Sequence, residues 1–168
     1  FYDQMGAGEY PCCDESHGHP VPWMSTAGAK VENLRRLRTY VKERDPEMGI
    51  GIELLSDRAA QHADYIHSQW GATGPTGFVE WFRYTFPEVV LTDREIRDET
   101  DMERKLNHCL LKGLRTDAEV YRCRRTVAAT PRYSAYLAQA NRLRDRYADL
   151  ILAGRYCDTE GFFIDNPA

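Results

Sequence analysis

The sequence lacks three features that would place it in a specialised class of protein. No apolar run approaches the roughly 20 residues of a membrane span, so no membrane partner is expected. The 22 basic and 26 acidic residues give a net charge of −4, without the positive excess typical of nucleic-acid binders. The five cysteines are odd in number and contain no Cys-x-x-Cys pair, so they predict no disulfide framework. What is present, 42% hydrophobic and 29% charged residues, is an ordinary globular balance.

Caps and apolar stripes predict four helices, over residues 26–45, 56–69, 100–113 and 130–154. Pro46 ends the first helix, because the residue before a proline disfavours helical geometry. Thr100–Glu103 forms a capping box for the third helix. Thr130 and Pro131 open the fourth helix, and Gly154 ends it.

Short extended segments separate these helices, at Phe1–Asp3, Gly49–Leu55, Trp81–Pro87 and Leu114–Tyr121. Strands that alternate with helices predict parallel βαβ units of about 30 residues. The pattern therefore predicts an α/β fold with about four βα units and a parallel sheet. Half of an eight-unit barrel and an open doubly wound sheet both fit, but no Gly-rich phosphate loop supports a nucleotide-binding open sheet. An antiparallel sheet with polar residues facing solvent is the alternative.

Two acids that end neighbouring predicted strands are the catalytic candidates. The carboxyl ends of adjacent parallel strands would bring Asp3 and Glu53 within roughly 5–10 Å, the range of a glycosidase pair. One carboxyl group would attack or stabilise the anomeric carbon, and the other would protonate the leaving oxygen. The alternative is that each acid caps a helix or pairs with an arginine.

The loop after the first predicted strand is rich in Cys, His, Gly and Pro. Asp14, His17, His19 and a cysteine have the chemistry of zinc ligands, but their spacing matches no zinc motif, so neither a metal nor a cofactor is predicted. The same loop with Trp23 suits a sugar site, because aromatic rings stack on pyranoses. The candidate substrate-binding residues are Gln4, Asp14, His17, His19, Trp23, Arg83, Glu88 and Asp117. Rivals for the proton-donor role are Glu88, Asp117 and Glu119.

Four stretches carry a family resemblance, namely Phe1–Glu9, Cys13–Pro20, Ile52–Glu53 and Arg83–Glu88. They resemble a bacterial domain family of unknown function that is grouped with the (β/α)8 glycoside hydrolases. The resemblance covers nearly the whole chain but only the second half of the family's barrel. It implies that residues 1–153 are the C-terminal half of a catalytic domain and that 154–168 begin the connection to a following β-domain. It also implies an extracytoplasmic or secreted protein.

A more distant resemblance is to endo-α-N-acetylgalactosaminidase-type barrels, which implies Asp3 as the nucleophile and Glu53 as the acid/base. The leading hypothesis is a retaining glycoside hydrolase that acts on a carbohydrate through these two carboxylates. An opening without Met or a leader indicates a fragment. The isolated chain is expected to be inactive, because it lacks the substrate contacts that the remainder of the barrel would supply. The alternatives are a metal-dependent hydrolase that uses the Cys/His loop and a sugar-binding barrel without catalysis.

Overall fold

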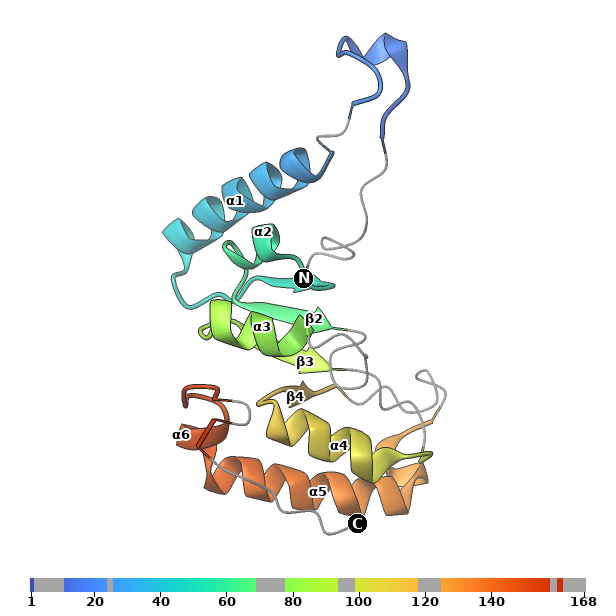
Figure 1. Ribbon diagram of the computed structural model, residues 1–168, viewed down its shortest axis with the longest axis vertical. Helices are drawn as coiled ribbons and strands as arrows, with labels where there is room; N and C mark the ends of the chain where they lie inside the picture. Colours follow the sequence, from blue (N-terminus) through green and yellow to red (C-terminus); the bar gives the residue numbers. More distant parts are fainter. Residues whose placement is uncertain are drawn as a thin grey trace. The chain divides into compact units, whose positions relative to one another are not determined.

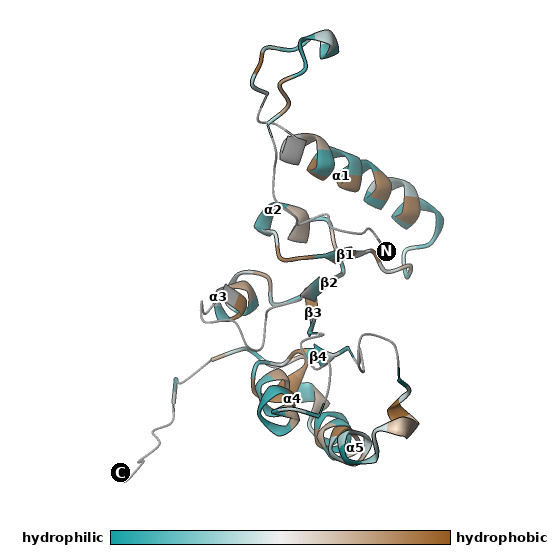
Figure 2. Cartoon of the chain, turned by 90° about the vertical axis from the view of Figure 1, so that its right-hand side faces the viewer, coloured by the Kyte–Doolittle hydropathy of each residue, from teal (hydrophilic) through white to brown (hydrophobic). Residues whose placement is uncertain are grey.

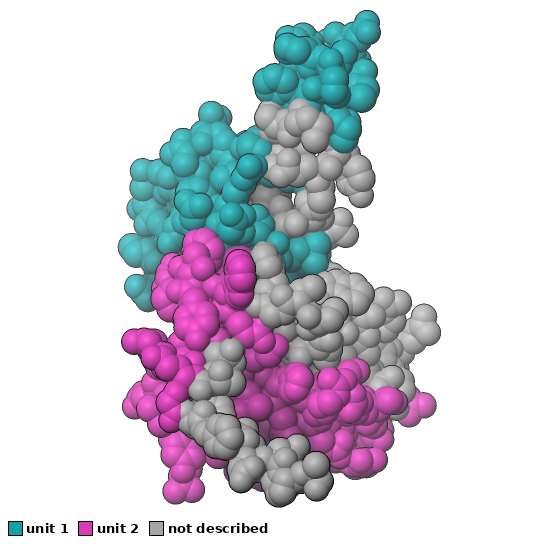
Figure 3. Space-filling model, in the orientation of Figure 1, with its two compact units in different colours: residues 1–68 teal, residues 69–168 magenta. Residues whose placement is uncertain are grey.

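The computed structural model describes residues 1, 11–23, 26–68, 78–93, 99–117, 125–157 and 160–161. The chain divides into two compact units, residues 1–68 and residues 69–168 (Figure 3). Each unit combines helices with a pair of parallel strands, so the chain is α/β, as the sequence predicts. None of the helices in the described ranges is long and apolar enough to cross a membrane.

Unit 1 contains one long helix and two short parallel strands (Figure 1). Its elements are η1 (Glu15–His17), α1 (Thr26–Arg44), β1 (Gly51–Glu53), α2 (Asp57–Ala60) and β2 (Tyr65–Ser68). In the β1–β2 ladder, Gly51 lies opposite Tyr65 and Glu53 lies opposite His67. The buried apolar side chains of this unit include Leu34, Ile50, Ile52 and Ile66. All three residues of β1 are buried, which is typical of a parallel strand.

The first predicted helix is confirmed, but the second is wrong beyond its first turn. Ser56 caps α2 as expected, since its Oγ accepts a hydrogen bond from the Ala59 amide at 3.3 Å. The helix then ends at Ala60, and Tyr65–Ser68 forms strand β2 instead. The carbonyl of Ile50 accepts hydrogen bonds from the amides of Asp64 and Tyr65, at 2.8 and 3.2 Å. Pairing with β1 therefore overrides the helical spacing of the apolar residues.

Unit 2 combines a second parallel strand pair with helices (Figure 1). Its elements are α3 (Phe78–Thr85), β3 (Val90–Asp93), α4 (Met102–Leu111), β4 (Arg115–Thr116), η2 (Val127–Ala129), α5 (Pro131–Arg146) and α6 (Ala148–Ile151). In the β3–β4 ladder, Thr92 lies opposite Arg115 and Asp93 lies opposite Thr116. The core of this unit includes Val89, Leu91, Met102, Leu106, Leu114 and Tyr133. Figure 2 shows that α4 and α5, which contact each other, carry both hydrophobic and hydrophilic residues.

The strand predicted at Trp81–Pro87 is wrong, because its residues 81–85 belong to helix α3, and this is the largest correction to the predicted fold. The residues that it buries, Val79, Phe82 and Arg83, follow the three- and four-residue spacing of a helix. The rings of Phe82 and Phe86, four residues apart, lie with centroids 5.0 Å from each other. The strand comes later, at Val90–Asp93, so the predicted spacing of the βα units does not hold.

The third and fourth predicted helices are confirmed with changed ends. The N-cap of helix α4 is Asp101, which has a φ of 58° and makes no side-chain cap, so the helix begins one residue later than the predicted cap at Thr100. The Asp101 carboxylate instead accepts hydrogen bonds from Arg104. Helix α5 begins at Pro131 but ends at Arg146, and α6 follows as a separate turn. The last predicted strand is confirmed at β4, and its residues 118–121 lie outside the described residues.

Candidate functional site

Two carboxylates are buried in the part of the chain that the structure describes, and each is the last residue of a parallel strand. Glu53 ends β1 with 5% of its surface exposed, and Asp93 ends β3 with 0% exposed. Burying a carboxylate costs several kcal/mol unless other groups compensate for the lost water. Buried carboxylates at the carboxyl ends of parallel strands are typical of active sites, since the loops that bind substrates follow these strand ends.

Glu53 sits where the backbone of unit 1 turns sharply. The next residue, Leu54, has a φ of 69°, in the left-handed region that branched side chains rarely adopt. Its amide donates a hydrogen bond to the carbonyl of His67 at 2.9 Å, which holds the turn against β2. Backbone strain of this kind concentrates at functional sites, so the turn adds weight to the carboxylate before it.

In unit 2, Asp93, which ends β3, and the predicted candidate Asp117, which follows β4, lie together. The Asp117 amide donates a hydrogen bond to the Asp93 carbonyl at 2.9 Å. Asp93 is not among the predicted site residues, because the sequence pattern places the strand in the preceding segment, Trp81–Pro87. The signal that would have found it is the apolar run Val89–Leu91 followed by Thr92 and an acid.

The side chains around Asp93 form a buried polar cluster rather than a nucleophilic site. Cys109 Sγ lies 4.0 Å from Asp93 Oδ2, and burial, together with the Asp93 charge, raises the pKa of this thiol to about 12. Arg144 Nη2 donates to the Leu114 carbonyl at 3.0 Å and to Thr116 Oγ1 at 3.3 Å. Because Cys109 stays a neutral thiol at ordinary pH, it is a packing residue.

Arg83 and Glu88 lie at the opposite end of β3 from Asp93. Both line a small pocket of about 50 Å³ with Val90 and Arg115, the residues that begin β3 and β4. Arg83 is in helix α3, not at a strand end, and burial lowers the pKa of its guanidinium. The structure therefore separates these two predicted residues from Asp117, which follows the carboxyl end of β4.

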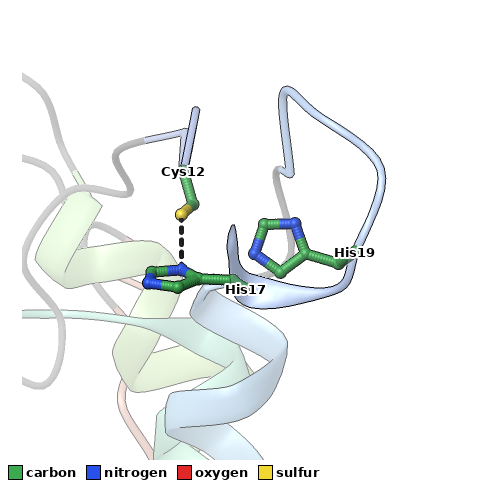
Figure 4. A group of neighbouring side chains, drawn as sticks. All are labelled: Cys12, His17 and His19. Carbon is green, nitrogen blue, oxygen red and sulfur yellow. Dashed lines mark hydrogen bonds between the residues drawn. The ribbon is translucent and has the colours of Figure 1, made fainter. Parts of the chain in front are cut away.

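The loop 11–23 brings together most of the residues that the sequence analysis selected there. Cys12 and Trp23 form an antiparallel bridge, with backbone hydrogen bonds of 3.0 and 2.8 Å, that closes the loop. His19 stacks on Trp23 with ring centroids 5.3 Å apart, and His17 lies edge-on to His19 at 5.6 Å. Figure 4 shows Cys12 and His17 pointing toward each other, with His19 beside them.

Asp14 anchors the turn that carries His17. Its Oδ1 accepts hydrogen bonds from the amide and the hydroxyl of Ser16, at 2.8 and 2.6 Å, and these bonds lower the pKa of the carboxyl group. Its Oδ2 lies 3.4 Å from His17 Nε2. Cys12, which the sequence analysis considered only as an unspecified cysteine, is the additional member of this cluster.

Comparisons with known proteins found no matching family model, curated protein or solved structure. The predicted residues Asp3, Gln4 and Glu119 lie outside the described residues.

Proposed function

We propose that this chain belongs to a carbohydrate-active hydrolase of the (β/α)8 type and that Glu53 is one of its two catalytic carboxylates. The observation that carries the proposal is the burial of Glu53 at the carboxyl end of a parallel strand. The acid of a glycosidase lies in a part of the active site that is shielded from water, and Glu53 occupies a position of this kind. The strained turn at Leu54 supports the same position.

In this mechanism, Glu53 donates its proton to the leaving glycosidic oxygen as the bond to the anomeric carbon breaks. Asp3 attacks that carbon and forms a covalent glycosyl-enzyme ester. Glu53, now a carboxylate, then takes a proton from water, whose oxygen displaces Asp3 and releases the sugar. Trp23, which is 40% exposed, offers an aromatic face for a pyranose ring.

The test uses the longest natural form of the protein with a panel of aryl glycosides. Glu53→Gln and Asp3→Asn should each lower kcat by roughly 10²–10⁴-fold, since each removes a group required in the transition state. Glu43→Gln, which changes an exposed glutamate on α1, is the matched control and should leave kcat unchanged.

The leaving group distinguishes the two roles. Dinitrophenolate leaves without being protonated, whereas phenolate needs a proton. Glu53→Gln should therefore form the glycosyl-enzyme from a dinitrophenyl glycoside with far less loss of activity than from a phenyl glycoside. Asp3→Asn should lose activity on both substrates. Near-normal turnover in both variants would reject the assignment. Sugar binding without hydrolysis by the unmodified protein would instead identify a binding barrel.

A further inference from the structure

The loop 11–23 gathers three metal-ligating side chains that the proposed mechanism does not use. One candidate ligand atom from each of Cys12, His17 and His19 lies within 4.8 Å of the other two (Figure 4). We propose that these three side chains bind a divalent cation of the zinc class. Thiolate and imidazole form the ligand set that zinc prefers over the harder cations calcium and magnesium.

The separations are close to those of a tetrahedral site. Zinc–sulfur and zinc–nitrogen bonds of about 2.3 and 2.05 Å place the sulfur about 3.6 Å from each nitrogen, and two nitrogens about 3.4 Å apart. Cys12 Sγ lies 3.1 Å from His17 Nδ1, and no pair of ligand atoms exceeds 4.8 Å. Shifts of about 1.5 Å or less therefore bring all three atoms onto one ion.

The second nitrogen of each histidine already faces an acceptor. Asp14 Oδ2 lies 3.4 Å from His17 Nε2, which favours the proton on Nε2 and leaves Nδ1 for the metal. His19 Nδ1 lies 3.1 Å from the Pro20 carbonyl, so this nitrogen is the donor and Nε2 is the ligand. Metal-binding histidines usually donate their other N–H to a carboxylate or a backbone carbonyl in this way.

The backbone of the loop positions the three ligands. The bridge between Cys12 and Trp23 fixes the base, and the 3₁₀ turn of η1 presents His17. Gly18 follows in the left-handed conformation, with a φ of 70°, and returns the chain so that His19 lies beside His17. Three protein ligands leave a fourth position for water or a further ligand.

Cys12, His17 and Asp14 alone would also suit a nucleophilic cysteine with its base and an orienting carboxylate. The position of His19 favours the metal, because a thiol nucleophile has no use for a second imidazole within reach of the sulfur. The two uses of Cys12 predict different outcomes when zinc is added.

The first experiment titrates the full chain with Co²⁺, a spectroscopic probe for zinc sites, under a non-coordinating reductant. One equivalent should give a sulfur-to-cobalt charge-transfer band and the visible absorption of tetrahedral cobalt. Cys12→Ser should abolish the charge-transfer band and weaken binding by more than roughly 100-fold, since even second-sphere changes cost about 10–100-fold. Cys13→Ser is the matched control, because Cys13 is the exposed neighbour outside the cluster and its loss should leave the band intact.

Two further readouts complete the test. Asp14→Asn should keep the band but weaken binding by roughly 10–100-fold, as expected for a positioning residue. Zinc should protect Cys12, but not Cys13, from alkylation by iodoacetamide, measured by peptide mass spectrometry. Absence of stoichiometric binding, a band that survives in Cys12→Ser, or equal alkylation of Cys12 with and without zinc would overturn the proposal.

Discussion

Gly51 lets the ring of Tyr65 lie against the neighbouring strand. A Cβ atom at position 51 would lie 1.9 Å from Cε1 and 2.2 Å from Cζ of this ring. Tyr65 is the residue opposite Gly51 in the β1–β2 pair. The ring also stacks on Phe1, with centroids 6.1 Å apart. Moving the ring to make room for a methyl group would therefore disturb this stacking.

Gly51→Ala should lower the free energy of unfolding of unit 1 by about 1–3 kcal/mol, the usual cost of overpacking. Urea denaturation of this variant, of Tyr65→Ala and of the double variant measures the coupling between the two positions. In the Tyr65→Ala background, the alanine at position 51 should cost much less, because no ring remains to meet the new methyl group. An equal cost in both backgrounds would contradict this account.

The elements of unit 1 are linked by Asp64, which connects α1 to the beginning of β1. Its Oδ1 pairs with Arg38 Nη1 at 2.9 Å, and its Oδ2 pairs with Lys42 Nζ at 3.1 Å, one turn further along the helix. The Ile50 amide donates to the same Oδ2 at 2.7 Å. Burial raises the pKa of Asp64, but these bonds together outweigh burial, so the pKa lies below its usual value.

The lowered pKa of Asp64 predicts how the stability of unit 1 depends on pH. The contribution of this carboxylate should be complete above its unfolded pKa of about 3.9 and should be lost as the pH falls through the lower folded value. The difference in free energy of unfolding between the unmodified protein and Asp64→Asn should therefore shrink in acid, as measured by urea denaturation from neutral pH downward. Glu43→Gln on the same helix is the control. A difference that stays constant with pH would refute the prediction.

At the scale of the whole molecule, each unit has its own apolar core. In unit 2 this core joins elements far apart in the sequence, since Leu91 comes from β3, Leu106 from α4 and Tyr133 from α5. Helix α4 has one buried side and one exposed side, because Leu106 is 0% exposed whereas Leu111 is 76% exposed. The same substitution at these two positions therefore separates core packing from helix propensity.

Leu106→Ala should destabilise unit 2 by about 2–5 kcal/mol, because it removes buried methyl groups and leaves a cavity. Leu111→Ala should change its stability by less than about 0.5 kcal/mol. Hydrogen exchange of peptides from α4 and α5 measures the effect on this unit alone, which matters because a two-unit chain need not unfold in one step. Similar losses of protection in both variants would contradict the assigned core.

Local signals in the sequence were sufficient for the α/β class, for helices α1, α4 and α5, and for the placement of Glu53 at a strand end. These signals are short-range: Pro46 stops α1, Pro131 opens α5, and the alternation around Ile52 marks β1. They depend on neighbours a few residues away, so no knowledge of the remaining chain is needed to read them.

Only the tertiary structure decided the secondary structure of residues 65–68 and 81–87. It alone also brought Asp93 and Cys12 into the candidate sites. Short apolar runs fit both the helical and the strand period, and the choice falls to partners distant in sequence, such as the Ile50 carbonyl for β2. Cys12 meets His17 because the chain returns at Trp23 to pair with it. Hydrogen bonds between residues distant in sequence stabilise one secondary structure over the other, and a local sequence pattern does not reveal these bonds.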